Sequence, residues 1–192
     1  MGNRSVSPVI SVILMVAVVV ILAATISVIV LDFTEDLGDP GPNVADTTGK
    51  FEPEPSGPFQ QDNQIVRITH KGGDSVAVEE IEIIVRASGP GDGLPTEARL
   101  INLPSTESSR LLDENIDGND GLISQGFGSA ELIVDDGTDV WSAGKTIEFR
   151  INTGTADFRD SAQGEPEEAD ELEVIVVHNP SNAIISEHTF TP

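Results

Sequence analysis

The chain of 192 residues contains no cysteine, which excludes disulfides, thiol nucleophiles and cysteine-ligated metal sites together. Basic residues are scarce, since 10 Lys and Arg face 33 Asp and Glu and the formal net charge is −23. Only Lys50, Lys71 and Lys145 are lysines. Because phosphate binding needs clustered Lys and Arg, nucleic acid is a poor partner for this chain.

The motifs of common enzyme classes are also missing. The sequence has neither a G-x-S-x-G elbow nor a phosphate-binding glycine loop. The three histidines, His70, His178 and His188, are far apart and lack the H-x-H or H-x-x-x-H spacing of metal ligands. We therefore expect no catalytic residue and no cofactor, and we interpret the histidines as structural or exposed.

One acidic segment has the spacing of a metal loop. Asp113, Asn115, Asp117 and Gly118 match the start of a calcium loop, D-x-[DN]-x-[DN]-G, whose oxygen ligands alternate before a glycine turn. Ser124 stands where such a loop carries its bidentate glutamate, and no helical pattern flanks the segment. Two interpretations stay open, a plain polar loop and a calcium site with Asp113, Asn115 and Asp117 as candidate ligands; we expect the former and no resident metal.

A long run without charge extends from Val6 to Leu31, between Arg4 and Asp32. As a helix, this run of residues 6–31 would be about 39 Å long, enough to span a hydrocarbon core of roughly 30 Å. The positive-inside bias of Arg4 places the N-terminus in the cytoplasm and the rest of the chain outside. The run is too long for a secretory signal peptide, and no small-x-small cleavage site follows it. A plain signal anchor stays an open alternative.

Small residues mark the ends of this predicted helix. We expect Ser7 to cap it and Pro8 to lie in its first turn, where the missing N–H breaks no hydrogen bond. Ser7 and Ser11 form a small-xxx-small pair, as do Ala23 and Ser27. Such pairs allow helices to approach closely without a hydrophobic driving force. The helix is apolar on all sides, which suits an element surrounded first by lipid and then by other helices.

The start of the chain resembles the archaeal type IV pilin precursors. The resemblance rests on a short leader, residues 1–5, and on Arg4-Ser5 followed by Val6-Ser7-Pro8, and it continues to Ile26. It implies that a membrane prepilin peptidase cuts between Ser5 and Val6 on the cytoplasmic side. It also implies that assembly machinery packs the helix with other pilins into a surface filament, which serves adhesion and biofilm formation. Bacterial pilins carry an early glutamate where this chain has Ile10, and archaeal pilins commonly lack it.

The remainder of the chain falls into two parts. Residues 32–63 are rich in Asp, Glu, Pro and Gly, which predicts an extended neck. From residue 64 to 192, alternating segments between turn signals predict an immunoglobulin-like antiparallel β-sandwich of about seven strands. A break in the alternation at Glu79-Glu80 is interpreted as a bulge. The predicted strands are 64–69, 76–86, 97–103, 131–134, 146–151, 172–177 and 183–190.

The acidity of this head has two interpretations, a disordered chain or a folded domain that stays hydrated in high salt. The predicted strands favour the folded domain. The scarcity of lysine beside abundant Asp and Glu resembles haloarchaeal proteins, and segments 68–74, 142–145 and 176–181 are similar to haloarchaeal pilin heads. The alternative function is a single-pass surface protein whose head binds a ligand and which does not polymerise.

Overall fold

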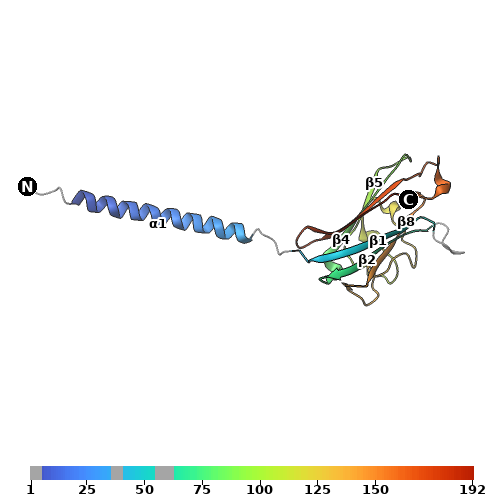
Figure 1. Cartoon of the computed structure of the whole chain (residues 1–192), viewed down its shortest axis with the longest axis horizontal. Coiled ribbons are helices and arrows are strands. Elements are labelled where there is room, and N and C mark those ends of the chain that lie inside the picture. The colour runs from blue at the N-terminus through green and yellow to red at the C-terminus, as the bar shows by residue number, and fades with distance from the viewer. Residues whose placement is uncertain (1–5, 36–40, 55–62) are drawn as a thin grey trace, which may run out of the picture. The chain divides into compact units, whose positions relative to one another are not determined.

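A computed structural model describes residues 6–35, 41–54 and 63–192 (Figure 1). It describes the side chains of all of these except residues 6–8, 28–35, 45 and 63. The chain divides into two compact units, Met1–Asp39 and Pro40–Pro192. The first contains the helix α1, Val6–Glu35. The second is built mostly from antiparallel strands. The expected N-terminal apolar helix followed by a mostly β head is therefore confirmed.

The smaller of the two main sheets has three strands in the order β1-β2-β8. Its strands are β1 (Val44–Glu52), β2 (Asn63–Gly73) and β8 (Thr146–Asn152). Strand β1 lies inside the segment expected to be a neck. It is a strand because its residues alternate between exposed and half-buried, and Val44 and Phe51 pack against the core.

The larger sheet has five strands in the order β10-β9-β4-β5-β6. Its strands are β4 (Ile81–Ser88), β5 (Thr96–Leu100), β6 (Ile116–Gly118), β9 (Glu171–His178) and β10 (Ala183–Phe190). A further small sheet pairs β3 (Val76–Ala77) with β7 (Val140–Trp141). All strand pairs in these three sheets are antiparallel.

The two main sheets share one hydrophobic core. On β4, Ile83 and Val85 are fully buried, while Arg86 between Val85 and Ala87 is exposed. The same buried cluster contains residues of the smaller sheet, among them Ile68 on β2 and Phe149 on β8. This period-2 burial is what the sequence alternation predicted for a sheet with one face in the core and the other in water.

Two predicted strands differ from the structure. The predicted strand 76–86 is interrupted by a 3₁₀ turn, Val78–Glu80, so the break at Glu79-Glu80 is a helical turn and not a bulge. The turn forms because Val78 is buried and its N–H donates to the Asp139 carbonyl at 2.9 Å. Segment 131–134 makes only single bridges, in part because Leu132 has a left-handed backbone with φ of 67°.

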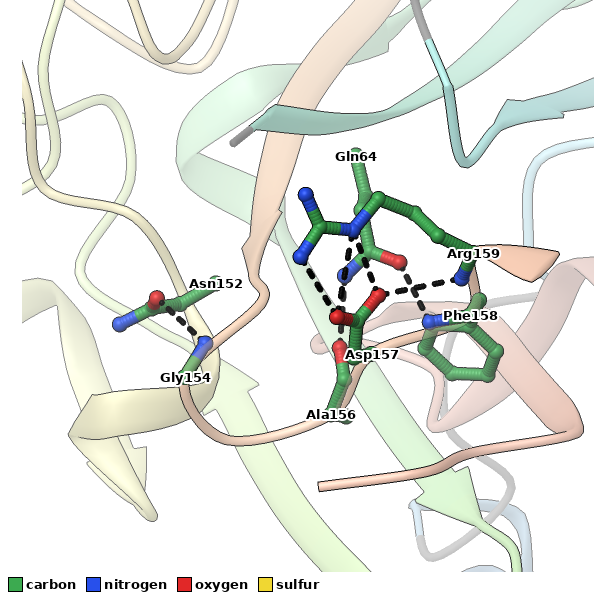
Figure 2. A network of polar contacts seen from close by, with 7 residues as sticks. All are labelled: Gln64, Asn152, Gly154, Ala156, Asp157, Phe158 and Arg159. Atoms are coloured by element: carbon green, nitrogen blue, oxygen red, sulfur yellow. Dashed lines mark hydrogen bonds and ion pairs between the residues drawn. The ribbon is translucent and has the colours of Figure 1, made fainter. Parts of the chain in front are cut away.

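A buried amide holds the loop that follows β8 (Figure 2). Gln64 on β2 is fully buried, and its Nε2 donates to the Ala156 carbonyl at 2.6 Å. The Phe158 N–H donates in turn to Gln64 Oε1 at 2.7 Å. Beside it, the Arg159 guanidinium donates to Asp157, with Nη2 2.6 Å from Oδ2. The side chain of Gln64 therefore replaces two backbone partners that the loop lacks.

Side chains of β1 and β10 close one side of the head. The Thr47 hydroxyl lies 2.9 Å from Ser186 Oγ and 3.0 Å from His188 Nε2. Phe51 packs against Phe190, with ring centroids 5.8 Å apart. Burial lowers the pKa of His188, because the charged ring is less well solvated there. The two strands belong to different sheets, so these contacts tie the sheets together without a backbone ladder.

Candidate assembly helix

Helix α1 is apolar on every side that the structure describes. It has 30 residues, which corresponds to a length of about 45 Å. By length and composition, Val9–Ser27 is sufficient to cross a membrane, and none of this segment is buried within the chain. The side chains of residues 9–27 are all exposed. An uncovered apolar surface of this extent is stable in lipid or against other helices, and not in water.

The hydroxyl groups near the C-terminal end of this segment are bonded within the helix itself. Thr25 Oγ1 donates to the Leu22 carbonyl, and Ser27 Oγ donates to the Ala23 carbonyl, each at 2.9 Å. Without a free hydroxyl donor, such residues enter hydrocarbon at low cost. Ala23 and Ser27 are exposed and lie one turn apart. Because both side chains are small, another helix can approach the backbone closely there.

The N-terminal site residues predicted from the sequence are described only in part. Arg4 and Ser5 lie outside the described residues, as does the rest of the leader. Val6 is the first residue of α1, and Pro8 lies in its first turn. Ser7 is the second residue of the helix. The structure does not describe the side chains of Val6, Ser7 and Pro8. Ser11 is exposed on the helix surface.

The candidate calcium ligands do not converge. Asp113 and Asn115 lie in a 3₁₀ turn, and Asp117 lies on β6 opposite Arg99. Asn115 is buried: its Oδ1 accepts from the Leu112 N–H at 3.1 Å and its Nδ2 donates to the Asn102 carbonyl at 2.9 Å. Its amide thus closes a turn of the backbone. Among the described residues, no group of three or more His, Asp and Glu is placed to hold a metal ion.

The histidines occupy three separate places in the head. His70 is buried, with its Nε2 2.9 Å from the Asp74 carbonyl and its ring edge against Trp141. The Nδ1 of His178 lies 2.7 Å from Ser181 Oγ in the turn after β9. His188 contacts Thr47, as described above. Each ring supports local packing, which agrees with the structural interpretation.

Arginines at the centre of each sheet were not singled out from the sequence. On the smaller sheet, Arg67 bonds to Glu52 and Glu148 on the two flanking strands, each at 2.7 Å. On the larger sheet, Arg86 bonds to Glu97 at 2.6 Å and to Glu173 at 2.9 Å. These hydrogen bonds, first that with Glu97, raise the pKa of Arg86. The pairing depends on strand register, which single-strand periodicity does not give.

The helix and the strands together define the class of this chain: one apolar helix near the N-terminus, long enough to cross a membrane, followed by a folded acidic β head. Comparison with family models then narrows the class. Residues 4–45 match the model described as archaeal type IV pilin, N-terminal, which is the family the sequence resembles. Residues 4–45 are thus similar to the N-terminal domain of archaeal type IV pilins. A search of curated proteins found no match to the chain.

Proposed function

We propose that this chain is the precursor of a structural subunit of an archaeal type IV pilus. The observation that carries the proposal is the pilin match over residues 4–45, which contains the whole of α1. A prepilin peptidase cuts between Ser5 and Val6, and the assembly machinery then moves the helix from the bilayer into a filament of this or related pilins.

The described surface of α1 suits both environments. In the bilayer, its apolar side chains face lipid and its backbone groups are bonded within the helix. In a filament, the same side chains pack against neighbouring helices, and Ala23 and Ser27 allow a close approach. The helix carries no glutamate near its start, so docking of subunits depends on packing and not on a buried salt bridge.

The head is proposed to lie outside the cell, with the precursor's N-terminus in the cytoplasm. There it serves surface adhesion and biofilm formation, as in the family the chain resembles. Its excess of carboxylates suits a salty habitat, where screening shortens the repulsion between them. Residues 1–5 remain the proposed leader.

The N-terminus of the mature chain tests this proposal. Peptide mapping of membranes and sheared filaments from cells that make the wild-type chain is expected to give a start at Val6. Ser5→Trp is expected to block the cut, because a bulky residue replaces the small one before the cleaved bond, and to abolish filaments seen by electron microscopy. Asn3→Gln, in the same leader, serves as the control and is expected to be cut normally.

The same experiment separates the alternative of a single-pass surface protein. That protein would keep its leader residues in every cell fraction and would form no filament, although its head folded and its helix stayed in the membrane. A wild-type chain that retains residues 1–4 throughout would contradict the pilin proposal. Loss of filaments on deletion of this chain, with the cut at Val6, would exclude the alternative.

A further inference from the structure

The head contains a polar groove that has no part in the proposed assembly through α1. Its volume is about 410 Å³, which is within the range of small-ligand sites. Three segments far apart in the sequence form it: residues 108–109, residues 130–138 and the turn at 144–146. Its apolar lining comes from Ala130, Leu132 and Val134, which are buried except for a small part of their surface. The groove is therefore a product of the tertiary fold, and it has an apolar part beneath a polar rim.

The polar rim offers both hydrogen-bond donors and hydrogen-bond acceptors. Hydroxyls come from Ser108, Ser109 and Thr138, and carboxylates from Glu131 and Asp136. A hydroxyl both donates and accepts, whereas a carboxylate only accepts. This set suits a ligand that carries many hydroxyl groups of its own, because each hydroxyl of the ligand meets either kind of partner.

Lys145 supplies the one ammonium group of the groove lining. Its side chain forms no ion pair or hydrogen bond with any residue that the structure describes, whereas Lys50 is paired with Glu52. Two carboxylates and one ammonium group leave the rim slightly negative, and the whole chain carries −23. An anionic ligand is therefore repelled, and a neutral one bearing oxygen acceptors for Lys145 is favoured.

The loop that carries an exposed aromatic ring, Phe127, is hydrogen-bonded to a lining residue of the groove. Phe127 is 77% exposed, and the Arg110 guanidinium lies 4.8 Å from its ring centroid. The Gly128 N–H donates to the carbonyl of Ser109, a lining residue, at 2.8 Å. The loop with Phe127 is thus tied to the groove through its neighbour. A flat ring held in water next to polar groups offers a stacking surface for an amphipathic ligand.

The backbone of the groove is held in an uncommon conformation at two of its lining residues. Ser109 and Leu132 are not glycines, yet both have a φ of 67°, in the left-handed region. Such conformations cost free energy and persist where the surrounding contacts impose them, often in ligand sites. They place the 108–109 segment and the 130–138 segment around the same space.

We propose that this groove binds a neutral saccharide. The hydroxyls and carboxylates of the rim bond the ring hydroxyls of the sugar, Lys145 donates to its oxygens, and Leu132 and Val134 contact its C–H face. Phe127 stacks on the adjoining sugar unit. The biological purpose of such binding rests on the proposed function, because a surface filament would use it to attach to a saccharide-coated surface. Saccharide binding itself requires neither cleavage of the leader nor assembly of the filament.

The test is equilibrium dialysis of the full-length, unassembled chain in non-ionic detergent against labelled maltose, lactose and chitobiose, with glucuronic acid as the anionic probe. We expect at least one neutral disaccharide to bind with a dissociation constant on the order of 1 mM and more tightly than glucuronic acid. Lys145→Ala and Phe127→Ala are each expected to weaken that binding about tenfold. Lys71→Ala and Ile184→Ala, exposed residues outside the groove, are the matched controls.

Three outcomes would overturn the inference: no binding of any of the three disaccharides, binding that the groove variants leave unchanged, or tighter binding of glucuronic acid. The fluorescence of Trp141, which is buried and the only tryptophan, confirms that each variant is folded. Failure here leaves the cleavage and filament results untouched, and failure of those leaves this measurement valid, so the two proposals are tested separately.

Discussion

At the scale of the residue, two arginines of the head each reach two carboxylates. Arg67 and Arg86 each stand on a central strand and bond to a glutamate on either side. On an exposed surface each pair adds little stability, about 0–1 kcal/mol. Their larger effect is on register, because a shift of one residue would turn every one of these side chains to the other face.

Gln64 has a larger role, because it is buried and its partners are backbone groups. Gln64→Leu keeps the volume but leaves the Phe158 N–H and the Ala156 carbonyl without partners. We expect the free energy of unfolding to fall by about 2–4 kcal/mol. Urea unfolding of the full chain in detergent, followed by Trp141 fluorescence, measures this change.

Asn152→Ala is the matched control for that experiment. Asn152 also bonds a backbone group, since its Oδ1 accepts from the Gly154 N–H at 3.0 Å, but this bond is exposed (Figure 2). Water replaces an exposed partner, so the loss is expected to stay below about 1 kcal/mol. Equal losses in the two variants would show that Gln64 does not hold the loop.

At the scale of the element, β1 differs from the other strands in how it is held. It pairs through its backbone with β2 and contacts β10 only through side chains. The close approach depends on Gly49: a Cβ built there would lie 2.6 Å from His188 Cγ and 2.8 Å from Phe190 Cζ. Strand β1 thus packs closely against β10 at Gly49, where there is no room for a larger side chain.

Gly49→Ala is therefore expected to separate β1 from β10. Because both contacts are with rings packed on the strand, the rings or the strand must shift, and we expect a loss of about 1–3 kcal/mol in unfolding free energy. Gly72→Ala is the matched control in the same sheet, where an added Cβ meets nothing within 4 Å. It is expected to be neutral or slightly stabilising, since alanine restricts the unfolded chain. A similar loss at both positions would contradict the close fit.

At the scale of the whole molecule, the helix unit and the head differ in the solvent that suits them: an apolar one for the helix and water for the head. Helix α1 exposes a continuous apolar surface over Val9–Ser27, and most of the acidic residues belong to the head, which is built around one core. The 33 acidic residues repel one another far more than 10 basic residues offset. Folding brings these carboxylates closer together, so the repulsion opposes the compact state at low salt.

Salt is therefore expected to stabilise the head. In non-ionic detergent, the melting temperature followed by Trp141 fluorescence is expected to rise as potassium chloride increases from about 0.1 M to 1 M, over which the Debye length falls from about 10 Å to 3 Å. Screening also weakens the arginine pairs, but the repulsion is larger because carboxylates outnumber cations. A melting temperature that stays flat or falls would contradict this, and sucrose serves as the uncharged control.

The helix and most strands follow from local patterns in the amino-acid sequence. A charge-free run has only one structure that satisfies its backbone in lipid, and alternation of Ile and Val with polar residues places one strand face in the core. These patterns are local, so α1, β2, β4, β8, β9 and β10 were expected near their observed bounds.

Features that join distant segments became visible only in the folded chain. Proline and glycine around β1 indicated a neck. In the structure, β1 pairs with β2, and the Thr47 hydroxyl lies within hydrogen-bond distance of His188, 141 residues later. The Asp113–Asp117 spacing left a polar loop and a calcium site open, and it did not show that the amide of Asn115 bonds the backbone. The groove with Lys145 likewise needs three separate segments. A local pattern does not contain these partners, because their energies depend on which surfaces the folded chain brings together.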